Sequence, residues 1–321
     1  MTVGILYDEI VARREAPADA RAALDAVDAV AHALRELGHT PLAVPVGADL
    51  DEWTDRLRDA RVDLVFNLCE SVAGAASREA SVAAVVELMG LPMTGSRAET
   101  LALARRKDRV NALLAAAGVP VPPWTVVPPG APPPRDWDRF PAIAKPAGED
   151  ASVGISQRSV ARDRDELDAA IEQAAPHGPV LLQEFLTGRE LAVAFVGERA
   201  LPISEIDYAG MPDGCWPMLC YRAKWDAGSP EDLATTPRCP AALERRTRAR
   251  ALELAEAAWR LVEGTGYGRV DLRADADDNL YVLEVNPNPD ITPSAGLARM
   301  AAADGWSYTD LIRRIVREAA A

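Results

Sequence analysis

The sequence predicts an α/β protein in which a small parallel α/β domain is followed by two units of mixed strands and helices. Over roughly the first 90 residues, strand and helix patterns alternate, which is typical of a parallel sheet. The middle of the chain reads as short strands around one helix, and residues 267–286 read as two strands joined by a polar turn. A length of 321 residues is enough for two or three domains.

The elements of the first domain each carry a local signal. Residues 3–7 form a short apolar run, as expected of a buried strand. Residues 19–37 place apolar side chains at helical spacing, and Gly38 follows in the usual position after a helix. The other expected elements are strands at 40–46 and 63–67 and helices at 53–60 and 77–89.

Glycines and prolines mark the boundaries in the rest of the chain. A helix is expected at 99–117, ended by Gly118, before a proline-dense stretch at 119–134. That stretch could be a disordered linker, but residues 124–127 suit a short strand, so we expect an ordered crossing between domains. Further strands are expected at 142–146, 149–155, 180–184, 190–196 and about 201–207, further helices at 164–174, about 241–263 and 308–319, and an irregular segment at 209–240.

The overall composition excludes several classes of function. A formal net charge of −14 argues against broad nucleic-acid binding. Four cysteines form no CxxC pair and three histidines are scattered, which argues against a zinc site and a Ser-His-Asp mechanism. The chain starts like a β-strand rather than a signal peptide, and no apolar run approaches the roughly 20 residues of a membrane span. We therefore expect a cytoplasmic protein.

The two strands at 267–286 carry the most informative residues. Alternation along a strand predicts that Arg269, Asp271 and Arg273 share one face, and that Glu284 and Asn286 share a face with Val282. Asp, Glu and Asn oxygens are hard ligands, suited to magnesium that holds a nucleotide phosphate. The alternative is that Arg269 and Asp271 form an ordinary cross-strand ion pair.

A nucleotide site of a common type is absent from the sequence. There is no GxxxxGK[ST] loop, and no GxGxxG follows the first strand. Lys145 instead ends a strand before a loop that contains Ser152 and Gly154, whose backbone N–H groups could surround phosphate oxygens. The alternative there is a plain hairpin loop. Downstream, the strand edge at 183–186 could bond an adenine, and a glutamate could accept from ribose hydroxyls, although such glutamates are usually solvated.

Taken in order, these residues resemble the ATP-grasp superfamily, in its D-alanine–D-alanine ligase-like branch. The order is Lys107 on a helix, Lys145 with its small-residue loop, the two glutamates near 184–190, and then the 267–286 strands. The resemblance runs from about residue 3 to 316. The stretches that also carry it are 90–96, 101–107, 113–120, 221–225 and 284–289.

The resemblance implies a three-domain ATP-grasp fold, with a Rossmann-like N-terminal parallel sheet and ATP between two antiparallel sheets. We place the domains at residues 1–95 (N-terminal), 96–182 (central lid domain) and 183–321 (C-terminal catalytic domain). It also implies an ATP- and Mg²⁺-dependent carboxylate–amine ligase: a carboxylate attacks the γ-phosphate of ATP to give an acyl phosphate, and an amine then displaces phosphate. Two Mg²⁺ ions are expected, Mn²⁺ could replace them, and the relatives suggest a homodimer.

The resemblance also assigns residues. The expected catalytic residues are Arg269, Lys224 and Ser152. The expected metal ligands are Asp271, Glu284 and Asn286. The expected ATP-binding residues are Lys107, Lys145, Ser152, Val153, Gly154, Glu184, Phe185, Leu186, Glu190, Lys224 and Leu283.

The departures from the family pattern lie around the amino-acid substrates. The family's Glu, Ser and Tyr that anchor the first D-alanine fall on a poorly matched Glu15, on Ala151 and on Trp225. The serine that binds the second substrate falls on Ala295, beside Ser294, and residues 67–70 replace a His-Gly stretch. Alanine cannot replace a hydroxyl, so we predict poor D-alanyl-D-alanine synthesis. Candidates for a rebuilt pocket, unless they are surface charge, are Glu9, Glu70, Arg78 and Glu79.

Small amino-acid-like or peptide-like substrates are therefore expected. The alternatives are a strict D-alanine–D-alanine ligase, an ATP-grasp small-molecule kinase, and a nucleotide-binding regulator without turnover. The complete set of metal ligands argues against the last of these.

Overall fold

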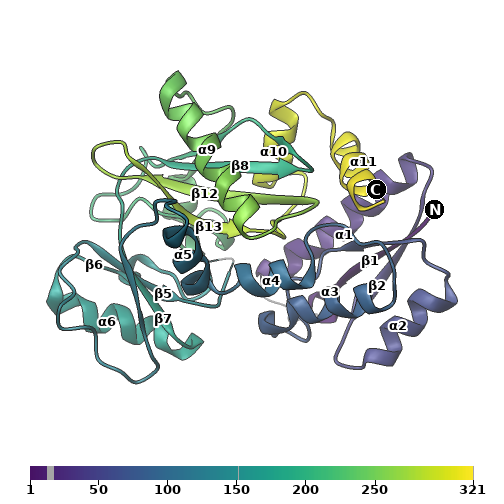
Figure 1. The fold of residues 1–321 in the computed structure, drawn as a ribbon, viewed down its shortest axis with the longest axis horizontal. Coiled ribbons are helices and arrows are strands. Elements are labelled where there is room, and N and C mark those ends of the chain that lie inside the picture. The colour runs from purple at the N-terminus through teal and green to yellow at the C-terminus, as the bar shows by residue number, and fades with distance from the viewer. Residues whose placement is uncertain (13–17, 151, 321) are drawn as a thin grey trace.

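The computed structural model describes residues 1–12, 18–150 and 152–320, and it has the mixed α/β architecture that the sequence predicts. Three sheets make up the fold (Figure 1). The parallel sheet lies on the right of that view, the central sheet at lower left, and the third sheet above and between them. The assignments of Glu15 and Ala151 fall outside the described residues.

The first sheet is parallel, in the order β2-β1-β3, with β1 Thr2–Asp8 in the middle, β2 Thr40–Val46 and β3 Leu64–Asn67. Helix α1 (Ala18–Glu36) packs on one face, where Val30 and Leu34 meet Ile5. Helices α2 (Leu50–Asp59) and α3 (Glu79–Leu88) pack on the other face. The predicted alternation is confirmed, with 3₁₀ turns at η1 (Glu9–Ala12) and η2 (Ala76–Arg78).

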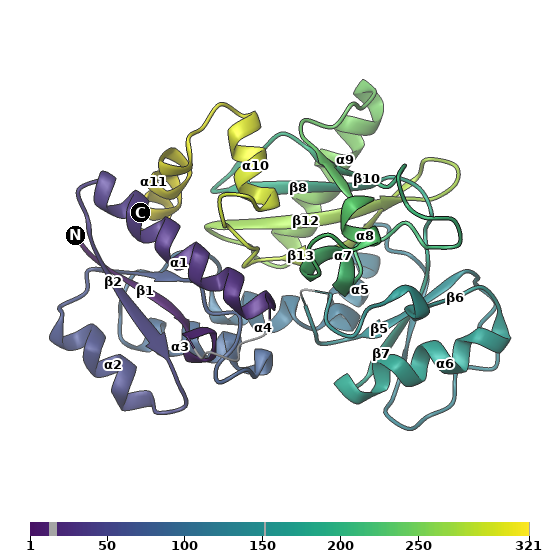
Figure 2. The same ribbon diagram turned by 180° about the vertical axis from the view of Figure 1, so that it is seen from behind.

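The N-terminal sheet shares its core with the end of the chain. Helices α10 (Gly296–Ala303) and α11 (Tyr308–Ala319) contribute Leu297, Leu311 and Ile315 to the cluster that contains Ile5 and Leu34. Figure 2 shows α11 beside α1, with α10 next to α11. The first and last parts of the chain are therefore packed as one body.

The central sheet is antiparallel, in the order β4-β7-β5-β6, and helix α6 (Arg164–Ala174) covers one of its faces. The expected strand at 149–155 is wrong: its described residues form turns, and Ser152 and Gly154 have φ angles of 62° and 73°. Such left-handed backbone cannot continue a strand. The other elements here are β4 Trp124–Val127, β5 Ala142–Pro146, β6 Val160–Ala161, β7 Val180–Glu184, η3 Gln157–Ser159 and η4 Ala175–His177.

The third sheet is antiparallel, in the order β11-β10-β8-β12-β13, with β9 paired to β8. Helix α9 (Arg245–Leu261) covers one face, and Leu254 and Trp259 pack there against Val270 and Val282. The opposite face of β12 and β13 carries the candidate site. The remaining elements are β8 Glu190–Val196, β9 Arg199–Ala200, β10 Ser204–Asp207, α7 Tyr221–Trp225, α8 Pro230–Leu233, β11 Thr236–Arg238, β12 Tyr267–Ala274 and β13 Leu280–Asn286.

The single helix expected at 99–117 is two helices, α4 (Ala98–Ala104) and α5 (Lys107–Ala116). The chain restarts at Lys107, whose backbone N–H donates to Ala147 O at 3.1 Å. A contact from the central unit therefore replaces a bond within the helix, and periodicity could not reveal it.

The division into three domains stays a prediction. Each sheet belongs to one of the three expected parts of the chain, but the expected boundary between residues 182 and 183 falls inside β7. Within the described ranges, no helix has both the length and the apolar character needed to cross a bilayer.

Candidate ATP site

The β12–β13 hairpin places the expected metal and arginine residues together. Arg269 pairs with Asn286 and Asp271 pairs with Glu284 in the strand register. A bulge follows, so Leu272 pairs with Val282 and Leu283 is left as an extra residue. Val282 therefore joins the α9 core, and the expectation that it shares a face with Glu284 is wrong. Leu283 lies instead beside Lys107 and Glu284 around a small hollow.

Arg269 and Asp271 form a bidentate ion pair. Arg269 Nε lies 2.6 Å from Asp271 Oδ1, and Nη2 lies 2.8 Å from Oδ2. Burial alone would lower the pKa of Arg269, but Asp271 outweighs it and raises that pKa above its usual value. The two residues are two apart on one strand, so this pair is not the cross-strand one of the simpler interpretation.

Oxygen ligands suited to a hard cation are present, although they are not preassembled. Asp271 and Glu284 are directly opposed across the strands, where like charges repel unless a cation lies nearby. Across the described residues, no three His, Cys, Asp or Glu side chains form a ready metal-binding group, and Asp271 is engaged by Arg269. The donor chemistry of these carboxylates, with Asn286 next along β13, fits Mg²⁺.

Lys107 is buried beside these carboxylates. Its Nζ lies 3.6 Å from Glu284 Oε1, donates to Glu149 O at 2.6 Å, and bonds Asp150 Oδ1. Burial by itself would lower the pKa of Lys107, but Glu284 and Asp150 outweigh it and raise the pKa. Lys107 is therefore a charged group of the site rather than a solvated helix residue.

Lys145, at the end of β5, adds a second buried ammonium. Burial lowers its pKa to about 8, Glu284 opposes this effect, and the charge of Lys107 adds to it. The two neighbouring ammonium groups repel each other, and phosphate oxygens bound between them would relieve that cost.

The loop after β5 is held by one contact with a distant segment and by contacts near it in the sequence. Ser152 Oγ donates to Leu219 O at 2.9 Å, and Val153 N–H donates to Asp150 O at 3.0 Å. A Cβ on Gly154 would lie 2.9 Å from His177 and from Pro146, so only glycine fits. The loop is packed against the rest of the central unit at this point.

The expected adenine edge follows β7. The N–H groups of Glu184 and Phe185 already donate to Pro123 O and Pro141 O, at 2.9 and 2.8 Å. The next backbone N–H along the chain, that of Leu186, is therefore the one that could donate to an adenine base. The side chains of Phe185 and Leu186 are buried. The adenine role stays a prediction.

Glu190 begins β8 and is held by two donors. Its Oε2 accepts from Arg273 Nη1 at 2.5 Å and from Tyr208 OH at 2.8 Å. Among the described residues, no hydrogen bond reaches Oε1, so this oxygen can accept a further donor. Lys224, unlike the buried Lys107 and Lys145, is exposed on α7, with its Nζ 5.1 Å from the centre of the Trp225 ring.

The candidates for a rebuilt substrate pocket are scattered, with one exception. Glu9 is half-buried, whereas Glu70 and Arg78 are exposed. Ser294 is exposed beside Ala295. Glu79 is the exception, because it is 8% exposed and joins a network that reaches the hairpin.

Asn288 makes that connection, and residue-by-residue reasoning did not single it out. Its Nδ2 donates to Glu79 Oε1 and to Cys69 O, both at 3.1 Å, and its Oδ1 accepts from Tyr267 OH at 3.0 Å. Asn288 lies two residues after Asn286. The only sequence signal was its place in the 284–289 stretch.

Comparisons with known proteins agree with this geometry. Residues 113–317 match the family model for the C-terminal part of D-alanine–D-alanine ligases. The chain is 34% identical over 296 residues to a D-alanine–D-alanine ligase of Gluconobacter oxydans, covering 92% of this chain and 93% of the relative. It is 31% identical to the enzyme of that name from Geobacter sulfurreducens, covering 98% and 92%.

A solved structure shows the same fold. The D-alanine–D-alanine ligase of Bacillus anthracis complexed with ATP superposes with a TM-score of 0.77 at 20% identity, covering 100% of this chain and 97% of that one. This confirms the ATP-grasp architecture. Together with the family model and the relatives, it shows that the chain belongs to the D-alanine–D-alanine ligase family.

Proposed function

We propose that the chain is an ATP- and Mg²⁺-dependent ligase that joins the carboxylate of one small amino-acid-like molecule to the amine of another. The observation that carries this proposal is the single face on which Arg269, Asp271 and Glu284 meet the buried Lys107. Cations and hard oxygen ligands in one place suit phosphoryl transfer, which depends on position and on charge neutralisation.

In the first step, a substrate carboxylate oxygen attacks the γ-phosphorus of ATP, and ADP leaves. In the second, the amine nitrogen attacks the acyl carbon, phosphate leaves, and the nitrogen loses a proton. Lys107 and Lys145 balance phosphate charge, with Lys224 contributing from α7. Arg269 faces the oxygens that gain charge at the acyl centre. Ser152, Val153 and Gly154 cover the phosphates and keep water from the acyl phosphate.

Asp271, Glu284 and Asn286 would hold Mg²⁺, which when bound neutralises charge on the phosphate oxygens. Arg269 would then share Asp271 with the metal, which frees guanidinium donors for the substrate. Two ions, or Mn²⁺ in their place, belong to the same proposal.

The proposed substrates differ from D-alanine, the amino acid in the name of the relatives. The name of those relatives makes D-alanine the first compound to test. Trp225 and Ala295 offer no hydroxyl where substrate recognition is expected, so we propose that D-alanine alone is a poor substrate pair. A homodimer in the cytoplasm belongs to the same proposal.

The decisive experiment supplies ATP, Mg²⁺ and panels of D- and L-amino acids, and measures ADP, phosphate and product mass. Hydroxylamine should trap the acyl phosphate as a hydroxamate, which a kinase that merely phosphorylates its substrate would not give. A nucleotide-binding regulator would release no ADP.

The matched variants test the metal ligands. Asp271→Asn should reduce ADP release at least about 100-fold, because the metal and Arg269 lose a charged partner. Asp277→Asn changes an exposed carboxylate in the turn of the same hairpin and should leave the rate unchanged. Near-normal turnover by Asp271→Asn would rule out the metal assignment.

A further inference from the structure

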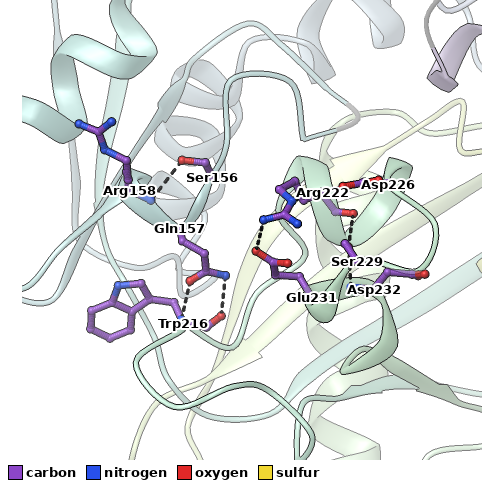
Figure 3. A network of polar contacts seen from close by, with 9 residues as sticks. All are labelled: Ser156, Gln157, Arg158, Trp216, Arg222, Asp226, Ser229, Glu231 and Asp232. Atoms are coloured by element: carbon purple, nitrogen blue, oxygen red, sulfur yellow. Dashed lines mark hydrogen bonds and ion pairs between the residues drawn. The ribbon is translucent and has the colours of Figure 1, made fainter.

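Residues 215–221 form a segment, here called the anchored segment, that leads into α7 and Lys224. Backbone groups of this segment are held by residues from elsewhere in the chain. Trp216 N–H donates to Gln157 Oε1 at 2.5 Å, and Gln157 Nε2 donates back to Trp216 O at 3.2 Å. Tyr221 N–H donates to Ile155 O at 3.0 Å. Figure 3 shows the two Gln157 bonds to Trp216.

Helix α7 is itself held to α8. Arg222 pairs with Glu231 at 3.3 Å and with Asp226 at 3.4 Å, and Ser229 Oγ donates to Arg222 O at 3.1 Å (Figure 3). A helix of five residues has little stability of its own. Its position, and with it that of Lys224, therefore depends on these contacts and on the anchored segment.

Arg273 connects this segment to the nucleotide end of the site. Its Nη1 bonds Glu190 Oε2 at 2.5 Å, and its Nη2 donates to Pro217 O. The guanidinium lies over Phe185 at 5.1 Å and over Tyr208 at 5.5 Å, and Arg273 is only 3% exposed. One rigid, planar group therefore fixes Glu190 and Pro217 relative to each other.

We propose that Arg273 is a positioning residue that couples nucleotide binding at Glu190 to the placement of the anchored segment and Lys224. The proposal rests on the proposed function, because it takes Glu190 as the ribose-binding carboxylate. A ribose hydroxyl on the other Glu190 oxygen fixes that carboxylate, which fixes Arg273 and hence the Pro217 carbonyl. Nucleotide binding then orders the segment that carries Lys224.

Lysine can separate the two contacts of Arg273. A single ammonium can stay with Glu190, but it lacks the forked geometry that reaches Pro217 O at the same time. Arg273→Lys should thus keep nucleotide binding and lose the ordering. Arg273→Gln, which also leaves a donor for one partner, serves if the lysine variant does not fold.

Arg189→Lys, at the residue before Glu190, is a matched control for Arg273→Lys. Arg189 also combines a bidentate carboxylate pair, to Glu205 at 2.6 and 2.7 Å, with a bond to a carbonyl, Ala242 O at 2.9 Å. Within the part of the chain that the structure describes, its hydrogen bonds go to Glu205 and Ala242 and not to the anchored segment. It therefore reproduces the chemistry of the change without the coupling.

The test is amide hydrogen exchange over residues 215–225 of the full chain, with and without Mg²⁺ and a non-hydrolysable ATP analogue. In the unmodified chain, and in Arg189→Lys, the nucleotide should slow exchange in this region. In Arg273→Lys, with nucleotide bound, exchange should be roughly five- to tenfold faster, as expected from one lost hydrogen bond. Gln157→Glu should speed exchange at Trp216 whether or not nucleotide is present.

Two results would overturn the inference: equal slowing in Arg273→Lys, or loss of slowing to the same extent in Arg189→Lys. Loss of nucleotide binding by Arg273→Lys would also refute it, because Arg273 would then serve affinity alone. If the unmodified chain binds no nucleotide, the proposed function fails with it. Binding by calorimetry in the unmodified chain distinguishes that failure from one of the coupling alone.

Discussion

Glu79→Gln should stabilise the protein, and more so as the pH rises. Glu79 lies in the first turn of α3, is 8% exposed, and accepts one hydrogen bond, from Asn288 at 3.1 Å. Burial raises its pKa from an ordinary value of 4.5 to about 8; the Asn288 bond opposes the shift, and Asp150 and Glu70 add to it. The folded protein therefore holds a proton that the unfolded chain releases.

The sign and size follow from that difference. Because the folded state binds more protons between pH 4.5 and about 8, the free energy of unfolding falls as the pH rises through this window. At ~1.4 kcal/mol for each pH unit, the cost at pH 7 is about 3 kcal/mol. We expect glutamine, which is neutral in both the folded and the unfolded state, to recover about 2 kcal/mol of this cost.

The assay is urea unfolding at pH 5, 7 and 8. Glu79→Gln should match the unmodified protein near pH 5 and exceed it increasingly at pH 7 and 8. Glu256→Gln removes an exposed carboxylate on α9 and should run parallel to the unmodified protein. Parallel curves for Glu79→Gln as well would refute the buried, protonated state of this carboxyl group.

Two further predictions concern packing and charge. A Cβ on Gly268 would lie 2.2 Å from the Trp259 ring, so Gly268→Ala should lower the free energy of unfolding by about 3 kcal/mol. At Gly296 no atom lies nearer than 3.9 Å to such a Cβ, so Gly296→Ala should raise the free energy of unfolding by about 0.5 kcal/mol. Urea midpoints that move in the same direction for both variants would refute this prediction. Lys145, with its pKa lowered to about 8 by burial, loses its charge above that pH, so nucleotide affinity measured by calorimetry should weaken from pH 8 upward. Lys145→Arg should remove that pH dependence. Identical pH profiles of nucleotide affinity for Lys145→Arg and the unmodified protein would contradict the role of the Lys145 charge.

The hairpin could be predicted from the sequence because its logic is local. Alternation along β12 correctly placed Arg269, Asp271 and Arg273 on one face, and the polar turn set the length of the connection. Alternation failed where the ladder slips. The bulge at Leu283, between the Asp271–Glu284 and Leu272–Val282 pairs, turns Val282 toward the core and leaves Leu283 beside Lys107. No residue pattern in the sequence marks that extra residue.

Other features depend on contacts between distant segments, which a single sequence does not display. The break before α5 exists because Lys107 N–H meets Ala147 O. In the sequence, Arg273 is one more charged residue of a strand. Its role depends on contacts with Glu190 and Pro217, which lie 83 and 56 positions away in the sequence. Turn backbone at Ser152 likewise follows from its contact with Leu219, which strand propensity could not anticipate.

The same contacts suggest how ATP use and substrate choice can change independently. The nucleotide side is held by Lys107, Lys145 and the Arg273 cluster, all within the central and third sheets. The N-terminal domain reaches the hairpin through a different contact, since Asn288 Nδ2 donates to Cys69 O and to Glu79 Oε1. Substitutions on that side can alter the substrate pocket while Asp271, Glu284 and the lysines stay in place. The residues proposed to bind ATP and those proposed to recognise the substrates can therefore vary separately within one fold.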